Sequence, residues 1–380
     1  MLRRCLIAIA LTAASWAHAD TGRHADDAYR VGQTVRTFKP DAPREWRGAQ
    51  TNALVTRIWY PADSTTPVVA HDIGPPGHPI FRGHPAADNA AVATNRARYP
   101  LLLLSHGTAG SADELDWLAA ALASRGYIVA GVNHPGNNAL EPLTREGFVL
   151  WWERATDLSE ALDGMLADPT FGKRIDPERI GAVGFSLGGY TILELAGART
   201  DLQAFESYCR GPAADSTCHP PAAKNEPVRA EPLSAGAVAS LKRSGASYRD
   251  PRVKAVFALA PALGKALDEQ SLARIAIPIR LVAGTADTTA PPPANILHIA
   301  QFLPHARVSM IEGARHETFL DTCVATAVST HAALCKEAPG VDRDAAHTLA
   351  IDAAVDFFQS SLIDRKGTTA PLAARSSESP

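Results

Sequence analysis

A serine that could act as a nucleophile stands in the run Gly184-Phe185-Ser186-Leu187-Gly188. The apolar stretch Ile180–Phe185 precedes it and a helix-forming stretch, Thr191–Ala196, follows it. This is the strand–turn–helix setting of a strained turn that exposes a serine hydroxyl. Glycines flank the serine because so tight a turn brings neighbouring backbone too close for a Cβ atom. The alternative in a chain rich in Gly and Ala is an ordinary turn, but the flanking elements favour a nucleophile.

A serine hydroxyl is a weak nucleophile unless an imidazole takes its proton and a carboxylate orients that imidazole. Asp287 follows the apolar run Ile279–Ala283, and His316 follows the run Arg307–Ile311, so both are expected at the carboxyl ends of strands. Taken singly, the aspartate could cap a turn and the histidine could lie on the surface. Their order after Ser186 predicts a catalytic triad of Ser186, Asp287 and His316.

Other acids fit the role of Asp287 less well. Asp268 falls within a predicted helix, and Glu317 adjoins His316 too closely in sequence to orient it. The loop Leu259–Ala262, which follows another predicted strand, contains no carboxylate. Asp287 is therefore the preferred acid.

Hydrolysis through a tetrahedral intermediate also needs backbone donors for the oxyanion. One candidate is the N–H group of Leu187, directly after the nucleophile. The second is expected in the loop after the strand Tyr99–Ser105, where Thr108 is the first choice and Gly107 the alternative. The neighbouring His106 is expected to hold this loop in place.

Apolar runs predict strands that alternate with helices along most of the chain. Two runs, Tyr29–Phe38 and Ala53–Tyr60, come first and are expected to form an antiparallel pair. Further strands are predicted at Tyr99–Ser105, Tyr127–Val132, Ile180–Phe185, Val253–Ala258, Ile279–Ala283 and Arg307–Ile311. Helices are predicted at Ala112–Arg125, Asp157–Leu166, Thr191–Ala196, Lys265–Ile275, Ala294–Phe302 and Ala345–Leu362. Such alternation predicts an α/β fold with a mostly parallel central sheet and helices on both faces.

The domain organisation follows from length and composition. The 380 residues, of which 46% are hydrophobic, suffice for one large α/β domain, expected over residues 20–364. About fifty residues, 199–252, interrupt the alternation and are expected to form a small cap inserted into the domain. Residues 365–380 are polar and are predicted to be a disordered tail.

The first residues have the features of a signal peptide over residues 1–19. Arg3 and Arg4 precede an apolar stretch, and Ala17-His18-Ala19 forms a small-x-small cleavage site. That stretch is too short to span a bilayer, and no other long apolar segment follows. The sequence therefore predicts a periplasmic or secreted protein with no membrane span.

Four cysteines remain after the signal peptide, and an even number in an exported protein favours disulfides. The local pairs Cys209–Cys218 and Cys323–Cys335 are the simplest of the three possible pairings. A metal site is the alternative, but the spacings lack the short Cys-x-x-Cys pattern.

Metal and nucleic acid are not expected as partners. The loop Pro61–Arg98 contains His71, His78 and His84, whose spacing suits neither a helix face nor a strand face, so a solvated loop is predicted. The net charge is −3 and no basic face is evident, which disfavours nucleic-acid binding. We expect no metal and no organic cofactor.

Several motifs together resemble the α/β-hydrolases. They are Ser105-His106-Gly107, the turn Gly184–Gly188 around Ser186, Asp287 and His316. The resemblance spans roughly Tyr99 to Leu362. Within that superfamily the chain looks like the branch that contains platelet-activating-factor acetylhydrolases and predicted dienelactone hydrolases. Two further runs, Asn133-His134-Pro135-Gly136 and Trp152-Glu153-Arg154, are similar to that branch. True dienelactone hydrolases use a Cys nucleophile, so the serine here argues against that activity.

The sequence therefore predicts a serine carboxylic-ester hydrolase that acts through an acyl-enzyme on a small-molecule or polymeric ester. Uncharged short acyl esters are expected first, then lipid or polyester chains, because no second charged cluster is evident. Trp151 and Trp152 are candidates for lining the acyl pocket, or else one is a core residue and the other a surface residue. The alternatives are a serine peptidase of the same fold and a non-catalytic binding protein on a hydrolase scaffold. The sequence does not define the oligomeric state.

Overall fold

The computed structural model describes residues 28–40, 44–63, 65–218 and 232–364. The predicted signal peptide (residues 1–19) and the predicted tail (residues 365–380) lie outside the described residues. Residues 219–231 of the predicted cap also lie outside them.

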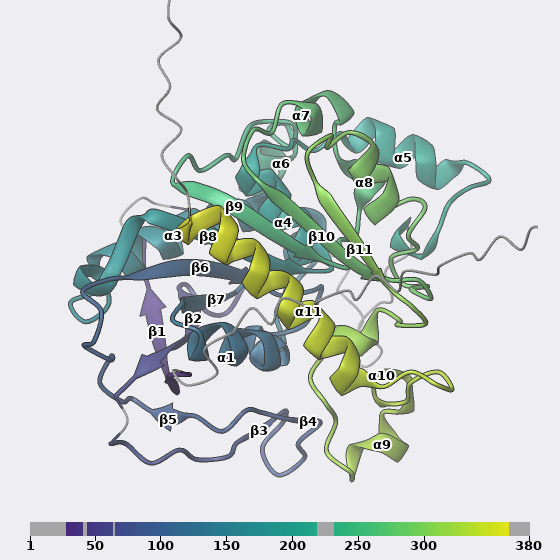
Figure 1. The fold of residues 1–380 in the computed structure, drawn as a ribbon. Coiled ribbons are helices and arrows are strands. Elements are labelled where there is room, and N and C mark those ends of the chain that lie inside the picture. Colours follow the sequence, from purple (N-terminus) through teal and green to yellow (C-terminus); the bar gives the residue numbers. More distant parts are fainter. Residues whose placement is uncertain (1–27, 41–43, 64, 219–231, 365–380) are drawn as a thin grey trace, which may run out of the picture.

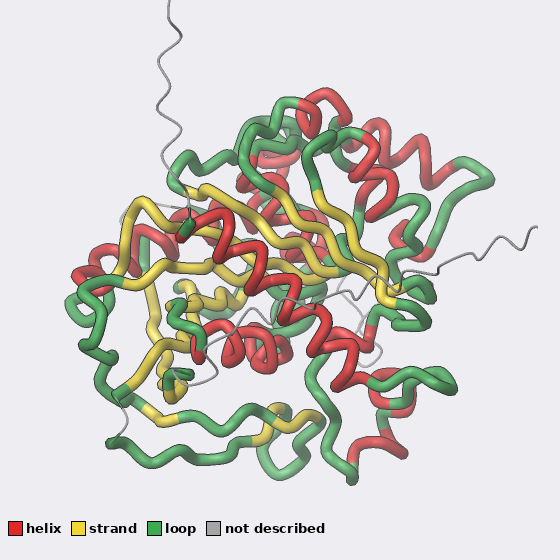
Figure 2. Tube along the Cα trace, viewed as in Figure 1, coloured by secondary structure: helices red, strands yellow, loops and turns green. Residues whose placement is uncertain are grey.

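Among the described residues, a sheet of nine strands forms the centre of the molecule (Figures 1 and 2). Its strands are β1 (Arg30–Phe38), β2 (Leu54–Ala62), β5 (Ala87–Asp88), β6 (Tyr99–Ser105), β7 (Ile128–Asn133), β8 (Ile175–Phe185), β9 (Val253–Leu259), β10 (Ile279–Gly284) and β11 (Arg307–Ile311). Their order across the sheet is β11-β10-β9-β8-β6-β7-β2-β1-β5. Two short strands, β3 (Asp72–Ile73) and β4 (Phe81–Arg82), form a separate antiparallel pair.

The strands from β7 to β11 in this order run parallel to one another, while β2 runs antiparallel to both β7 and β1. The predicted antiparallel opening pair is therefore confirmed, with Gly32 opposite Tyr60. Because parallel strands all end at one edge, the loops that follow β6, β8, β10 and β11 meet there.

Helices cover both faces of the sheet, as predicted. They are α1 (Asp116–Ser124), α2 (Arg145–Val149), α3 (Glu153–Ala167), α4 (Leu187–Ala196), α5 (Leu202–Arg210), α6 (Ala235–Leu241), α7 (Glu269–Ala273), α8 (Ile296–Gln301), α9 (Ala327–Thr330), α10 (Ala332–Cys335) and α11 (Arg343–Phe358). Figure 1 shows α11 and α1 in front of the sheet and α3 and α4 behind it. The mostly parallel, doubly covered sheet confirms the predicted fold class.

Burial explains why the central strands read as unbroken apolar runs. Every residue of β6 is buried, because helices cover both of its faces. Helix α4 is likewise buried along its whole length, which fixes the turn that precedes it.

Two predictions of local structure are wrong. The helix expected over Lys265–Ile275 is a 3₁₀ turn, Gly264–Ala266, followed by α7. Asp268 interrupts it, because its side chain accepts a hydrogen bond from the Ser271 N–H group and so starts a new helix as N-cap. The loop 61–98 is also less open than expected: it contains β3, β4 and β5, of which β5 pairs with β1.

Candidate active site

Ser186 occupies the turn between β8 and α4 in a strained backbone conformation. Its φ is 56° and its ψ is −120°, values that residues other than glycine rarely adopt. A Cβ atom on Gly184 would lie 2.1 Å from the Gly188 carbonyl oxygen, and one on Gly188 would lie 1.9 Å from the Ser105 carbonyl oxygen. Both flanking positions therefore require glycine.

The structure brings the predicted acid and base to this serine. The His316 Nε2 atom lies 2.8 Å from Ser186 Oγ, and His316 Nδ1 lies 2.7 Å from Asp287 Oδ2. All three residues are buried, with 7%, 3% and 6% of Ser186, Asp287 and His316 exposed. Asp287 follows β10 and His316 follows β11, so adjacent parallel strands supply them.

Hydrogen bonds to Asp287 fix how the imidazole can be protonated. Its Oδ1 atom accepts bonds from the Thr289 and Ala290 N–H groups, which leaves Oδ2 for the imidazole. A carboxylate is an acceptor only, so Nδ1–H of His316 donates to it and Nε2 is left to accept the serine proton. The rejected acid Glu317 instead accepts a bond from Thr289 Oγ1.

Neither candidate oxyanion donor has a hydrogen-bond partner among the described residues. Leu187 is the first residue of α4, so its N–H group has no acceptor within the helix. Thr108 is exposed, and in the described part of the chain its N–H group makes no hydrogen bond. The next N–H group, that of Ala109, is already used by Asn137 Oδ1. A Cβ atom on Gly107 would lie 3.3 Å from Ser186 Cβ, which shows how closely this loop approaches the nucleophile.

The structure corrects the prediction for one of the two tryptophans. Trp152 is fully buried and donates a hydrogen bond to Ser240 Oγ at 2.8 Å, so it is a core residue beneath α6. Trp151 is only partly buried, and its ring packs edge-on against Phe205 of the cap and Tyr190 of α4. Tyr190 lies one turn along α4 from Ser186, so Trp151 stays a candidate for the pocket wall.

The described part of the segment 199–252, the predicted cap, contacts the loop that carries Asp287. Cys209 and Cys218 form a disulfide that closes the end of α5 onto a short turn. In that turn Ser216 Oγ donates to the Thr288 and Thr289 carbonyl oxygens, directly after Asp287. The predicted cap therefore contacts the loop after Asp287, and no pattern in the sequence indicated this contact.

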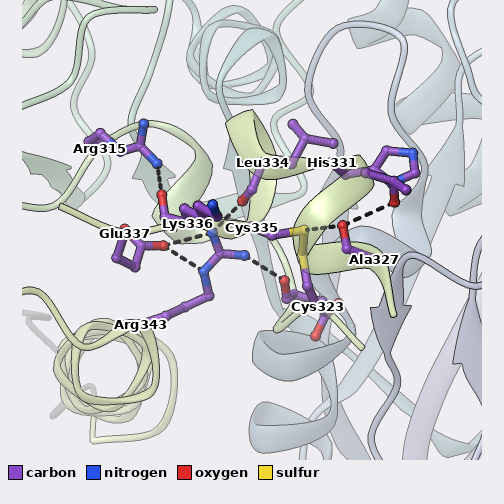
Figure 3. Close-up of a disulfide and its surroundings, with 11 residues drawn as sticks. Arg315, Cys323, Ala327, His331, Leu334, Cys335, Lys336, Glu337 and Arg343 are labelled. Carbon is purple, nitrogen blue, oxygen red and sulfur yellow. Dashed lines mark hydrogen bonds and ion pairs between the residues drawn. A yellow bond between two sulfur atoms is a disulfide. The ribbon is translucent and has the colours of Figure 1, made fainter. Parts of the chain in front are cut away.

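The second disulfide, Cys323–Cys335, lies in the segment that follows His316, and Figure 3 shows it beside Arg343 and Glu337. Arg343 donates to the Leu334 and Asp321 carbonyl oxygens and to Glu337 Oε1, and so ties the disulfide loop to α11. Glu337 in turn accepts from Thr318 Oγ1, two residues beyond His316. The segment after His316 is therefore held by the disulfide and by the contacts of Glu337 with Thr318 and Arg343.

The histidines of the loop 61–98 do not form a metal site in the structure. Within the described residues no group of three or more His, Cys, Asp or Glu side chains is arranged to hold a metal ion. His71 lies instead near Asp116, with 3.9 Å between Nε2 and Oδ1. No described helix is long and apolar enough to cross a membrane.

The strand order, the turn at Ser186, and the acid and base after β10 and β11 are those of the α/β-hydrolase fold, which is the fold of this chain. A solved structure of the same fold is the ferulic acid esterase from Streptomyces cinnamoneus. It aligns with 94% of this chain and 96% of its own, with a TM-score of 0.58 and 19% sequence identity.

In sequence, the chain is similar to the family "platelet-activating factor acetylhydrolase, isoform II", whose profile matches residues 82–145. The predicted resemblance is thereby confirmed over that segment, which contains the loop with Thr108 but not the triad. The chain is 37% identical over 94 residues to Lipase 1 of Moraxella sp. (strain TA144), covering 24% of this chain and 26% of the lipase. It is 33% identical over 108 residues to cutinase est1 of Thermobifida alba, covering 28% of this chain and 33% of the cutinase. The matches thus span about a quarter to a third of these relatives.

Proposed function

We propose that this protein is a serine carboxylic-ester hydrolase that works through an acyl-enzyme. The observation that carries the proposal is the continuous hydrogen-bonded chain from Asp287 through His316 to Ser186, with the serine held on a strained turn. The names of the similar proteins, a lipase, a cutinase and a ferulic acid esterase, support an ester as the substrate.

The three residues of the triad act in turn in the proposed reaction. His316 Nε2 takes the proton of Ser186 as its oxygen attacks the ester carbonyl carbon, and the resulting oxyanion is held by the Leu187 and Thr108 N–H groups. The imidazolium then protonates the departing alcohol, which leaves an acyl group on the serine. In the second half of the reaction His316 activates a water molecule, and Asp287 keeps the imidazole in the required tautomer throughout.

The proposed substrate is an uncharged ester, with short acyl chains first and lipid or polyester chains next. The proposed location is the periplasm or the exterior of the cell. Two disulfides and the signal-like residues 1–19 support that location.

The test is hydrolysis of a series of p-nitrophenyl esters from acetate to palmitate by the wild-type protein and by Ser186→Ala. We expect turnover by the wild type and a loss on the order of a millionfold in the variant, with an unchanged melting temperature. Labelling by a fluorophosphonate probe should depend on the same residue. Turnover in Ser186→Ala near the wild-type level would disprove the proposal, and cleavage of peptides in preference to esters would favour a peptidase.

A further inference from the structure

A second Ser–His–Asp chain lies buried beneath the loop that carries Thr108. Ser105 Oγ lies 2.8 Å from His134 Nε2, and His134 Nδ1 lies 2.8 Å from Asp157 Oδ2. These distances match those of the triad, but all three residues are 0% exposed. No substrate can reach Ser105, so this chain has a different role.

The charges around this second chain determine the direction of its hydrogen bonds. Burial lowers the pKa of His134 to about 3, so its imidazole is neutral at pH 7. Burial alone would raise the pKa of Asp157, but Arg47 and Arg44 hold it well below its usual value, so it is ionised. His134 Nδ1–H therefore donates to Asp157, and Nε2 accepts the Ser105 hydroxyl proton. The Ser105 oxygen keeps its lone pairs for another donor.

That donor is Arg154, the third guanidinium of the cluster. Its terminal nitrogen lies 3.4 Å from Ser105 Oγ and also donates to the His106 carbonyl oxygen. Arg47 pairs with Asp157, and Arg44 pairs with both Asp157 and Glu160. The described carboxylates form no ion pair with Arg154, and its remaining two nitrogens have no hydrogen-bond partner among the described residues.

In this cluster Arg44 and Arg47 are paired with Asp157 and Glu160, so the buried charge of Arg154 is left without an ion pair of its own. Burial lowers the pKa of its guanidinium to about 9, which still leaves it protonated at pH 7. Asp157 attracts this guanidinium, but that carboxylate is already paired with Arg47 and Arg44. A buried charge without a direct ion pair is costly, and fully buried arginines are rare for that reason. An anion that forms nearby during the reaction would offset this cost.

The backbone of the neighbouring loop shows where such an anion would form. Arg154 holds the His106 carbonyl oxygen, and His106 Nδ1–H holds the Gly107 carbonyl oxygen at 2.7 Å. His106 itself is fixed because its Nε2 accepts a bond from the His134 N–H group at 3.1 Å. Described peptide bonds in this loop are trans and planar, so each N–H group points opposite to the carbonyl oxygen of its own peptide unit. Fixing the two carbonyls inward therefore turns the Gly107 and Thr108 N–H groups outward.

We propose that Arg154 is a positioning residue for the oxyanion hole: it fixes the loop 106–108 through the His106 carbonyl group, and its excess charge stabilises the oxyanion through that loop. This inference rests on the proposed esterase function. It assigns no contact with substrate to Arg154. The buried chain Ser105–His134–Asp157 orients Arg154 and takes no part in bond making.

The test compares Arg154→Met, Arg154→Lys and a control, Arg252→Met. Arg252 directly precedes the amino end of β9 and forms ion pairs with Asp250 beside it and with Asp163 of α3. The loop 106–108 follows the carboxyl end of the parallel strand β6, at the opposite edge of the sheet, so the loss of Arg252 removes a charge and its ion pairs far from that loop. Each variant is assayed with p-nitrophenyl butyrate after the active fraction is titrated with a fluorophosphonate. The inhibition constant for a trifluoromethyl ketone is measured as well, because its hemiketal places an oxyanion where the intermediate does.

We expect Arg154→Met to lower kcat about a hundredfold per titrated site with KM nearly unchanged, which is the size of effect seen when one oxyanion donor is removed. The inhibition constant for the trifluoromethyl ketone should rise by a similar factor. Arg154→Lys, which keeps the charge but loses the planar geometry, should lie between the wild type and Arg154→Met. Arg252→Met should keep kcat and the inhibition constant within about twofold of the wild type.

The inference is wrong if Arg154→Met lowers only the titrated fraction or the melting temperature while kcat per site and the inhibition constant are unchanged. Where Arg154→Met does not fold, the same comparison with Arg154→Lys decides: an unchanged inhibition constant overturns the inference. Failure of the proposed function has a different signature, because the wild type would then neither hydrolyse the ester nor react with the fluorophosphonate.

Discussion

The two disulfides can be compared directly, because they close loops of similar length, one in contact with the loop after Asp287 and the other in the segment after His316. Their sequence separations are 9 and 12 residues. In the chain-entropy description each therefore restricts the unfolded chain by nearly the same amount, about 3 kcal/mol at 25 °C. A difference between the Cys209→Ser/Cys218→Ser variant and the Cys323→Ser/Cys335→Ser variant must then come from where each disulfide lies in the folded protein.

The contacts predict different kinetic effects. Loss of Cys323–Cys335 frees the segment that Arg343 and Glu337 tie to Thr318, and through it the loop that carries His316. A misplaced base slows every substrate, and a displacement of about 1 Å costs up to a hundredfold. We expect kcat to fall between about tenfold and a hundredfold, equally on acetate, butyrate and octanoate esters.

Loss of Cys209–Cys218 acts on the cap instead. Ser216, within that loop, makes its bonds to backbone carbonyls after Asp287 at an exposed position, so the acid itself remains held by the Thr289 and Ala290 N–H groups. We expect the ratio of octanoate to acetate turnover to change by at least about threefold before the melting temperature falls much, since the cap loosens locally. Kinetic profiles across the three esters at 25 °C, together with thermal melts, provide the comparison. If both variants give the same profile, the cap lies away from the substrate and the reasoning fails.

Three further predictions concern the acid, the elbow and the response to pH. Asp287→Asn should lower kcat about ten-thousandfold while the fold is kept, as followed by circular dichroism, because the imidazole loses its orienting carboxylate; a loss under tenfold would exclude Asp287 as the acid. Gly188→Ala should prevent normal folding or abolish activity, since its Cβ would lie 1.9 Å from the Ser105 carbonyl oxygen, whereas Gly245→Ala, whose Cβ would be 3.3 Å from its nearest neighbour, should retain both. Burial lowers the pKa of His134 to about 3 and that of His347 to about 4, so below about pH 6.5 each histidine binds a proton in the unfolded chain but not in the folded one. Burial raises the pKa of Glu114 to about 7 and that of Glu194 to about 8, and these two groups have the opposite effect over the same range. The contribution of His347 is therefore measured by difference: between pH 6.5 and pH 5 the unfolding free energy of the wild type should change by about 2 kcal/mol more in the destabilising direction than that of His347→Gln, as measured by guanidinium unfolding; the same pH dependence in both proteins would contradict it.

The central sheet was predictable because its strands are buried on both faces and therefore appear as continuous apolar runs. The positions of Ser186, Asp287 and His316 were predictable for a related reason: each follows such a run, and parallel strands end at a common edge. Their mutual distances come only from the structure.

The predictions that failed depended on side-chain contacts. A continuous helix over Lys265–Ile275 is consistent with the local sequence, but the Asp268 side chain caps a new helix inside it. Trp152 was indistinguishable from Trp151 until the structure showed its indole bonded to Ser240 in the core. The buried chain from Asp157 to Ser105 was hidden for the same reason, although His134 at the end of β7 was a signal that a polar group follows a buried strand.

The contact between β4 and the segment that follows β11 has a consequence for the timing of folding. Phe81 of β4 forms a bridge with Cys323, and these two residues pack with Ile73 and Ala327 in a small separate cluster. Because the ribosome delivers the N-terminal partner first, the apolar side of the β3–β4 pair stays open until the segment after β11 has been synthesised. That late segment also carries the surroundings of His316. An unfinished chain therefore has its serine long before it has a positioned base, and the protein becomes chemically competent only at the last stage of its assembly.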